Sequence, residues 1–267
     1  MGTIGVAVNV RVRVFKRGVM VRETWTHNKV VDVGLNVMRD RLGNGNFNPS
    51  HIAVGTDNTA PVAGDTLLGT EVFRKAITFT DIDDNSVSFE CFLGSTEANG
   101  NTLAEAGLFN NMFDDRQEMF SRVLITPTIA KDAETTATIA WVLTFTRASG
   151  ASPVDTGLDT FALLMTDQEN PLIEMAVGTD GTAVTAADTA LGAEVFREAI
   201  ARRLDAAQQI KFQMDLATGD ANGNTLRECA LFDDAGVMFA RAIISPPIVK
   251  TVSISTVLEF QFDLAEA

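Results

Sequence analysis

The most constraining feature of the 267-residue sequence is an internal repeat. With an offset of 123 residues, residues 54–77 (VGTDNTAPVAGDTLLGTEVFRKAI) align without a gap on residues 177–200 (VGTDGTAVTAADTALGAEVFREAI), and 17 of these 24 positions are identical. Residues 98–109 (ANGNTLAEAGLF) align on residues 221–232 (ANGNTLRECALF) at the same offset. A unit of this length is far longer than a solenoid repeat, so the repeat predicts two similar domains and not an array.

A stretch of small residues, RASGASP, separates the two copies near residues 147–153. Such a composition is typical of a linker. We therefore expect a first domain over residues 1–147 and a second over residues 148–267. The chain length agrees with two domains, at about 100–200 residues for each.

The hydrophobic pattern within each copy is mostly that of β-strands. Residues 4–14 carry Ile or Val at every second position, which predicts a strand with one buried face. The turn Lys16-Arg17-Gly18 then leads into a second strand at about residues 19–26, forming a hairpin. Alternation at residues 87–93 recurs at residues 210–216. Further strands are expected at about residues 52–55, 71–80, 103–109, 119–126 and 135–146.

One short helix is predicted in each copy. Apolar residues recur there at spacings that place them on one helical face: Leu35, Met38 and Leu42 in the first copy, and Leu158, Phe161 and Met165 in the second. The sequence thus predicts a mainly β protein. Its expected form is two tandem antiparallel β-sandwich domains from an internal duplication, each with one short amphipathic helix.

The charge balance bears on the partners. Lys and Arg number 21 against 35 Asp and Glu, a net charge of −14. Phosphate backbones and anionic lipid surfaces repel such a chain, so we expect neither nucleic acid nor membrane as a partner. No apolar run approaches the roughly 20 residues of a membrane span, and the alternating start does not resemble a signal peptide. Synthesis in a cytoplasm is therefore expected.

Histidine and cysteine, which often serve as catalytic or metal-binding residues, are few in this sequence and do not recur at equivalent positions in the two copies. His27 and His51 align with Gly150 and Glu174, so a triad or a histidine metal site is not expected. Cys91 and Cys229 lie in apolar strand patterns and are interpreted as core residues, and the two tryptophans, Trp25 and Trp141, as packing residues.

A calcium site in the loop Gly55–Glu71 is an alternative, because this loop holds Asp57, Asn58 and Asp65. Its second-copy equivalent holds Asp180 and Asp188. Such side chains more often cap turns, so we predict no catalytic, metal or cofactor site and no enzyme.

Several charged residues are kept in both copies although their neighbours differ. They are Glu71/Glu194, Arg74/Arg197, Glu105/Glu228, Arg122/Arg241 and Lys131/Lys250. Paired carboxylates can serve acid–base catalysis, but no nucleophile accompanies these. We interpret them as structural charge pairs, because partly buried charges need partners. Our hypothesis is that Glu105 pairs with Arg74 or Arg122, and that the second copy repeats the pair.

The ordered segments HNKVVDVGLNVMRDRL, HIAVGTDNTAPVAGDTLLGTEVFR, EANGNTLAEAGLF, MFSRVLITPTIAK and TATIAWVLTF carry a resemblance. The series resembles structural proteins of tailed bacteriophages and prophages, of the loosely defined tail-fibre or tail-collar kind. It covers residues 27–146 and recurs over about residues 154–262, where the second copy lacks the HN pair and reads CALF in place of GLF.

The resemblance implies a non-enzymatic virion structural protein, made in the bacterial host cytoplasm, that assembles as an oligomer with other virion proteins in the tail, neck or baseplate. A capsid decoration protein is an alternative in the same class. A carbohydrate- or receptor-binding module, with a host-surface glycan as partner, is an alternative in another class. We further expect the hairpin of residues 4–26 to dock to the particle, and deletion of residues 1–26 to abolish incorporation into the particle while the rest stays folded.

Overall fold

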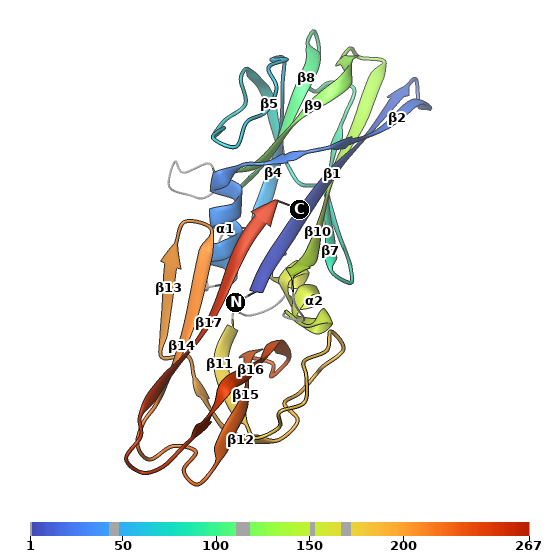
Figure 1. The fold of residues 1–267 in the computed structure, drawn as a ribbon. Helices are drawn as coiled ribbons and strands as arrows, with labels where there is room; N and C mark the ends of the chain where they lie inside the picture. The colour runs from blue at the N-terminus through green and yellow to red at the C-terminus, as the bar shows by residue number, and fades with distance from the viewer. Residues whose placement is uncertain (1, 43–47, 111–117, 150–152, 167–171, 267) are drawn as a thin grey trace.

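The computed structural model describes residues 2–42, 48–110, 118–149, 153–166 and 172–266. Within these residues the protein is mainly β, with three sheets and two helices (Figure 1). The mainly β prediction is therefore confirmed. The predicted linker near residues 147–153 lies partly outside the described residues.

The largest sheet contains eight strands and takes members from both copies of the repeat. Its order along the sheet is β13 (Arg202–Ala206), β14 (Gln209–Leu216), β17 (Thr256–Glu266), β1 (Gly2–Lys16), β10 (Thr135–Ser149), β7 (Ser86–Leu93) and β6 (Phe79–Asp83), and β2 (Val19–His27) pairs with β1. β1 runs antiparallel to β10 and parallel to β17. The first strand of the chain thus joins the two copies in one sheet.

Each copy also contributes a smaller sheet of its own. The five-stranded sheet has the order β3 (Lys29–Val30), β9 (Met119–Ala130), β8 (Thr102–Asn110), β4 (Pro49–Gly55) and β5 (Glu71–Ala76). The four-stranded sheet has the order β12 (Glu194–Ala199), β11 (Leu172–Gly178), β15 (Thr225–Asp233) and β16 (Met238–Val249). Strands β4 to β8 recur as β11 to β15 with the same bounds shifted by the repeat offset.

The helices α1 (Asp32–Leu42) and α2 (Asp155–Leu164) occupy equivalent positions in the two copies. Each packs on a small-sheet strand of its own copy and on large-sheet strands of the other. α1 contacts β9 together with β14 and β17, and α2 contacts β16 together with β7 and β10. The two copies therefore interlock through their helices as well as through β1.

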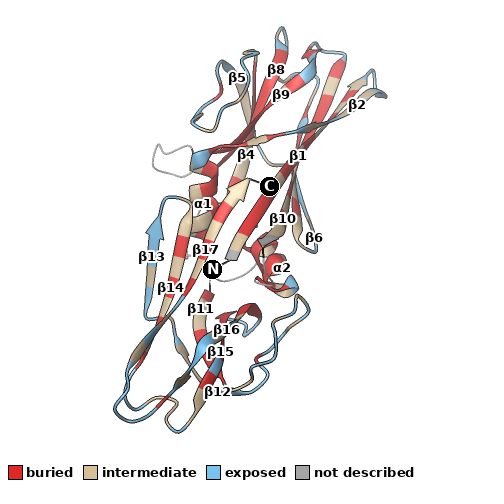
Figure 2. Ribbon diagram, in the orientation of Figure 1, coloured by how far each residue is buried: buried red, intermediate tan, exposed pale blue. Residues whose placement is uncertain are grey.

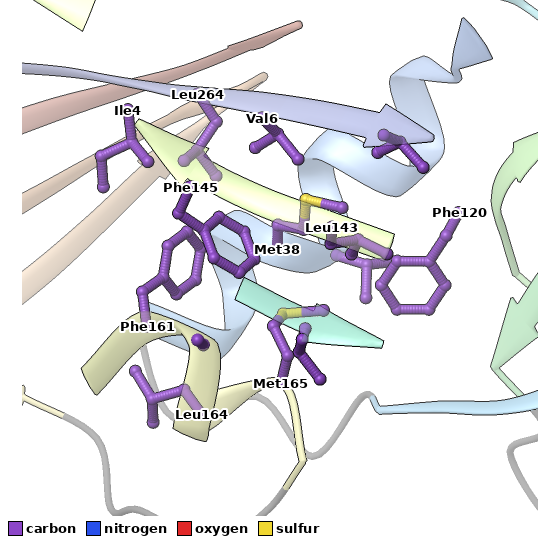
Figure 3. Close-up of a cluster of buried hydrophobic side chains, with 14 of the residues drawn as sticks. Ile4, Val6, Met38, Phe120, Leu143, Phe145, Phe161, Leu164, Met165 and Leu264 are labelled. Atoms are coloured by element: carbon purple, nitrogen blue, oxygen red, sulfur yellow. The ribbon is translucent and has the colours of Figure 1, made fainter. Parts of the chain in front are cut away.

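The core is continuous across this junction. Figure 2 shows buried residues running along β1, β10 and β17, and Figure 3 shows side chains from both copies in one cluster. Phe145 of β10 and Phe161 of α2 are in ring contact, with centroids 4.5 Å apart. Division of the chain into domains of residues 1–147 and 148–267 stays a prediction.

One predicted strand was wrong in its extent. The sequence predicted a single strand over residues 71–80, but β5 ends at Ala76 and β6 begins at Phe79, in different sheets. The intervening residues bond to two different elements: Ile77 N–H donates to Ser50 O, and Thr78 N–H to Glu90 O. The apolar pattern continues from β5 into β6, so the sequence does not reveal that the chain passes from one sheet to another at residues 77 and 78.

The predicted hairpin at residues 4–26 is confirmed as the antiparallel pair β1–β2. The structure argues against deleting β1 without loss of the fold, because β1 is a central strand whose inward side chains, Ile4 to Val12, are at most 2% exposed. Only β2 is largely exposed.

Candidate functional site

The charges kept in both copies form a buried ion network in each. Glu105 on β8 and Arg122 on β9 lie on neighbouring strands, and the Arg122 Nε atom is 2.8 Å from Glu105 Oε2. Their side chains are 0% and 4% exposed. In the second copy Glu228 on β15 and Arg241 on β16 make the same contact at 2.9 Å.

Each arginine also binds two carboxylates of a loop. Arg122 Nη1 is 2.8 Å from Asp65 Oδ2, and Nη2 is 3.0 Å from Asp57 Oδ2. Arg241 makes the equivalent contacts with Asp188 at 2.7 Å and Asp180 at 3.3 Å. One guanidinium thus serves three carboxylates, using the fork of donors that arginine supplies.

The buried glutamate holds both ends of that loop through backbone groups. Glu105 accepts hydrogen bonds from the N–H groups of Asp57 (3.3 Å), Gly69 (3.1 Å) and Thr70 (2.8 Å). In the second copy Glu228 accepts from Asp180, Gly192 and Ala193. These donors satisfy a carboxylate that would otherwise be costly to bury.

Glycines make room for the network. A Cβ atom on Gly55 would lie 2.4 Å from Glu105 Oε1, and one on Gly69 would lie 2.0 Å from Asp57 Oδ2. Gly178 and Gly192 are equally confined in the second copy. The repeated VGT and LG sequences are therefore explained by close approach to the carboxylates.

Hydrogen bonds and charge shift the titration of this cluster. The pKa of Asp57 is lowered, chiefly by its hydrogen bond from the Thr59 hydroxyl and further by Arg122. The pKa of Asp180 is lowered in the same way by Thr182 and Arg241. Burial alone would lower the pKa of Arg122, but hydrogen bonds to Asp65 and Glu105 outweigh it, and the net shift is upward.

The sequence left open whether Glu105 pairs with Arg74 or Arg122, and the structure has the contact with Arg122. Arg74 instead binds Glu71 through two hydrogen bonds of 2.9 and 2.6 Å. Its guanidinium also lies 3.9 Å from the centre of the Phe109 ring, a cation–π contact. Arg197 repeats both contacts with Glu194 and Phe232.

The repeated lysines are almost fully buried and hold a turn. Lys131 Nζ donates to Asn99 Oδ1 at 2.8 Å, and the backbone of Lys131 exchanges hydrogen bonds with the turn at Gly100 and Asn101. Gly100 has φ +83°, a conformation that favours glycine. Lys250 makes the equivalent backbone contacts, which accounts for the repeated sequence ANGN.

The histidines and cysteines make no hydrogen bond to this network among the described residues, although Cys229 directly follows Glu228 on β15. His27 is 3.3 Å from Asn9 Oδ1, and His51 is 2.9 Å from Ser50 Oγ. Both cysteines are free and buried, as predicted. Burial raises the pKa of the Cys91 thiol to about 11 and that of Cys229 to about 12, so both thiols stay protonated near neutral pH.

The two tryptophans differ. Trp141 is fully buried and donates its indole N–H to Ser121 Oγ at 2.9 Å. Trp25 is 55% exposed on β2, with the Arg11 guanidinium 5.3 Å from the ring centre. The interpretation of Trp25 as a packing residue was therefore wrong, because β2 is an edge strand whose alternation does not report burial.

The loop carboxylates converge on a guanidinium group. Arg122 lies between Asp57, Asp65 and Glu105, where a calcium ion would otherwise supply the positive charge. In the part of the chain that the structure describes, no group of three or more His, Cys, Asp or Glu side chains is arranged to hold a metal ion. The sequence offered Asp57 and Asp65 as turn-capping residues, with calcium ligation as the alternative, and both do cap turns: Asp57 accepts from the Thr59 N–H group and Asp65 from that of Val62. The sequence analysis did not connect them with Arg122, although their recurrence as Asp180 and Asp188 was a signal that could have placed them among the repeated charges.

No family model, curated protein or solved structure matches this chain. Within the described residues, neither helix has the length and apolar character needed to cross a bilayer.

Proposed function

We propose that this protein is a non-enzymatic structural protein of a tailed-bacteriophage or prophage virion, assembling as an oligomer in the tail, neck or baseplate. The order and spacing of the repeated motifs, which resemble those of tail-fibre and tail-collar proteins, support this assignment. A capsid decoration protein is the close alternative within the same class.

The single observation that carries the proposal is that the charged residues repeated in both copies bind one another and hold a loop in place. In both copies the buried Glu–Arg pair and two loop aspartates hold an exposed loop in one conformation. A catalytic carboxylate must be able to reach a substrate, whereas Glu105 and Glu228 are fully buried and satisfied by the protein itself. Two rigid, equivalent loops on one scaffold suit a protein whose role is assembly.

We further propose that the fold arose by duplication of one β-sandwich. The matching bounds of β4 to β8 and β11 to β15 support this origin, as do the equivalent helices and ion networks. In this proposal each small sheet faces its own strands of the large sheet, and β1 fuses the two sandwiches.

Cryo-electron microscopy of particles from the producing host tests the assignment. Density for this chain at the tail, neck or baseplate is the expected result. Density at five-fold or six-fold capsid positions would shift the assignment to decoration. Absence of the chain from purified particles, checked by mass spectrometry, would overturn the structural role.

One observation favours a glycan-binding alternative, namely the exposed Trp25, because aromatic faces stack on sugar rings. A glycan array that compares the wild-type chain with Trp25→Ala addresses it. A signal lost in the variant would favour this alternative, and no signal with the wild-type chain would remove it.

A further inference from the structure

Besides the outer edges of its end strands β13 and β6, the large sheet has two stretches of strand edge in its interior that pair with no strand among the described residues. Residues 256–261 of β17 pair with β14 on one side only, because β1 begins beside residue 262. β2 pairs with β1 on one side, with a register shift at Val14/Phe15, and among the described residues it pairs with no strand on the other, where the Arg22 guanidinium donates to Thr128 O of β9. Both stretches present unpaired backbone N–H and C=O groups, which is a template for strand addition.

The first copy shows what fills the position that is open in the second. Residues 256–261 of β17 correspond to residues 137–142 of β10, and those pair antiparallel with β1 over residues 9–14. The occupant in the first copy is thus an antiparallel strand from the hairpin β1–β2. The second copy has no such hairpin in its own sequence.

Two side chains at and next to the open position are more apolar and more exposed than their covered counterparts. Val257 is 53% exposed where the first copy has Thr138 at 8%, and Ile254 is 37% exposed where the first copy has Thr135 at 6%. Val249, at the end of β16, and Val252, in the turn that follows, are also exposed. Exposed apolar side chains beside an unpaired strand edge are typical of an interface.

The open edges of β2 and of residues 256–261 in β17 face opposite sides of the sheet. Along the strand direction they lie at opposite ends of β1. β10 pairs with β1 from Thr3 to Lys16, so β17 and β2 share the other edge of β1, one after the other. The open edge of β2 faces away from β10. The open edge of β17 faces the β10 side, because β14 covers its far side. A second copy shifted along the strands therefore brings its β2 beside residues 256–261 of the first.

The strand directions are compatible with this placement. β17 runs parallel to β1, and β2 runs antiparallel to β1. In a shifted copy of the same orientation, β2 therefore meets β17 antiparallel, as β1 meets β10 within the chain.

The distribution of charge along the chain also favours a second copy of this protein as the partner. Residues 2–30 contain six Lys or Arg and one Glu, a net charge of +5 in a chain of net charge −14. Residues 148–267 contain seven Lys or Arg and eighteen Asp or Glu, a net charge of −11. A basic hairpin and an acidic second copy attract one another between chains.

We propose that β2 of one copy of this chain adds antiparallel to residues 256–261 of another, joining chains head to tail through one continuous sheet. The exposed Val19, Met20 and Val21 of β2 then lie against the apolar surface around Val257. Such a heterologous contact closes into a ring or continues as a filament, according to the rotation between copies. The inference deepens the proposed assembly role and rests on it, because it names the contact by which the oligomer forms.

Sedimentation of the purified full chain over a range of concentrations tests self-association. The wild-type chain is expected to associate, and Val21→Lys and Val257→Lys are each expected to weaken association by about tenfold or more, as loss of a central apolar contact does at interfaces. Phe79→Lys is the matched control, since Phe79 is equally exposed on β6, an edge strand of the same sheet. Circular dichroism verifies that each variant is folded.

Cross-linking identifies the pairing. Val21→Cys and Val257→Cys chains, treated with a short bis-maleimide, are expected to cross-link only when mixed. Cross-linking of either variant with itself, or none in the mixture, would overturn the proposed contact, as would a wild-type chain that remains monomeric. These outcomes are independent of particle composition, so a chain that self-associates but is absent from virions would refute the virion role alone.

Discussion

Arg122 and Arg241 illustrate how much of this fold depends on single side chains. Each guanidinium is 3–4% exposed and binds three carboxylates, one of them fully buried. Backbone N–H groups of the loop supply the remaining hydrogen bonds to the buried glutamate. Removal of one member leaves an uncompensated charge in the interior, which costs more than the pair itself contributes.

Glu105→Ala is therefore expected to lower the free energy of unfolding by about 3–5 kcal/mol. Glu71→Ala, which breaks a partly exposed pair, is expected to lower it by less than about 1 kcal/mol. Chemical denaturation of both variants measures the difference. If Glu105→Ala unfolded at the wild-type midpoint, the structural interpretation of the network would be wrong.

The lowered pKa values of Asp57 and Asp180 predict an acid-sensitive loop. A carboxyl whose pKa is lower in the folded state stabilises the fold fully above its unfolded pKa of about 4, and this stabilisation is lost as the pH falls through the folded value. Thermal melts from pH 7 to pH 2 should show a smaller acid-induced loss for Asp57→Asn than for wild type. An equal acid-induced loss of stability in the two proteins would contradict the conclusion that Asp57 makes the loop acid-sensitive. The variant comparison is needed because burial raises the pKa of Asp159, Glu198 and Asp233, which act in the opposite direction.

At the scale of elements, the helices depend on glycine for their close approach to the sheets. A Cβ atom on Gly34 of α1 would lie 2.1 Å from the Phe120 carbonyl oxygen of β9, and one on Gly157 of α2 would lie 2.0 Å from that of Phe239. Both contacts involve backbone atoms, so the helix must move to accommodate a methyl group.

Gly34→Ala is accordingly expected to destabilise the protein by about 1–3 kcal/mol, the usual range for overpacking. Gly64→Ala serves as the control, because nothing lies within 4 Å of a Cβ atom there. Thermal denaturation compares the two variants. A Gly34→Ala protein as stable as Gly64→Ala would show that α1 does not pack as described.

β1 is the element on which both copies depend, since it pairs with β10, β17 and β2. Deletion of residues 2–16 should abolish folding, whereas Val19→Ser on the exposed β2 should leave the circular dichroism spectrum unchanged. A protein that still folds without residues 2–16 would instead support the expectation that the N-terminal hairpin can be deleted without loss of the fold.

The sequence predicted elements better than their partners. Alternation at residues 4–14, 87–93 and 210–216 identified strands and their buried faces correctly. The same alternation misassigned Trp25, because on an edge strand both faces can be exposed. It also concealed the crossing at Ile77 and Thr78, where the chain changes sheet without a break in apolar character.

For the whole molecule, the shared core predicts cooperative unfolding. Phe161 of α2 packs on Phe145 of β10, and both belong to a single buried cluster that spans the two copies. Phe161→Ala should lower stability by about 3–5 kcal/mol while scanning calorimetry still records one transition. Two transitions, of which only one shifts, would indicate autonomous domains over residues 1–147 and 148–267.

The repeat predicted that the two copies share their elements, but not that they share a sheet. Sequence similarity at a fixed offset reports what recurs, and β1 and β2 do not recur. Pairing of Gly2 with Phe262 depends on a contact that no local pattern encodes. The site was more accessible to sequence analysis, since the recurring Glu105, Arg122 and loop aspartates all belong to the network.

The pairing of β1 with β17 has a consequence for synthesis. About 260 residues separate the paired positions Gly2 and Phe262, so at about 5–20 residues per second β1 leaves the ribosome on the order of 10–50 s before its parallel partner. During that interval the edge of β1 at residues 2–6, which later pairs with β17, stays open to other chains. Nascent copies on one messenger are then close enough to exchange strands, and slow translation favours such exchange over closure within one chain.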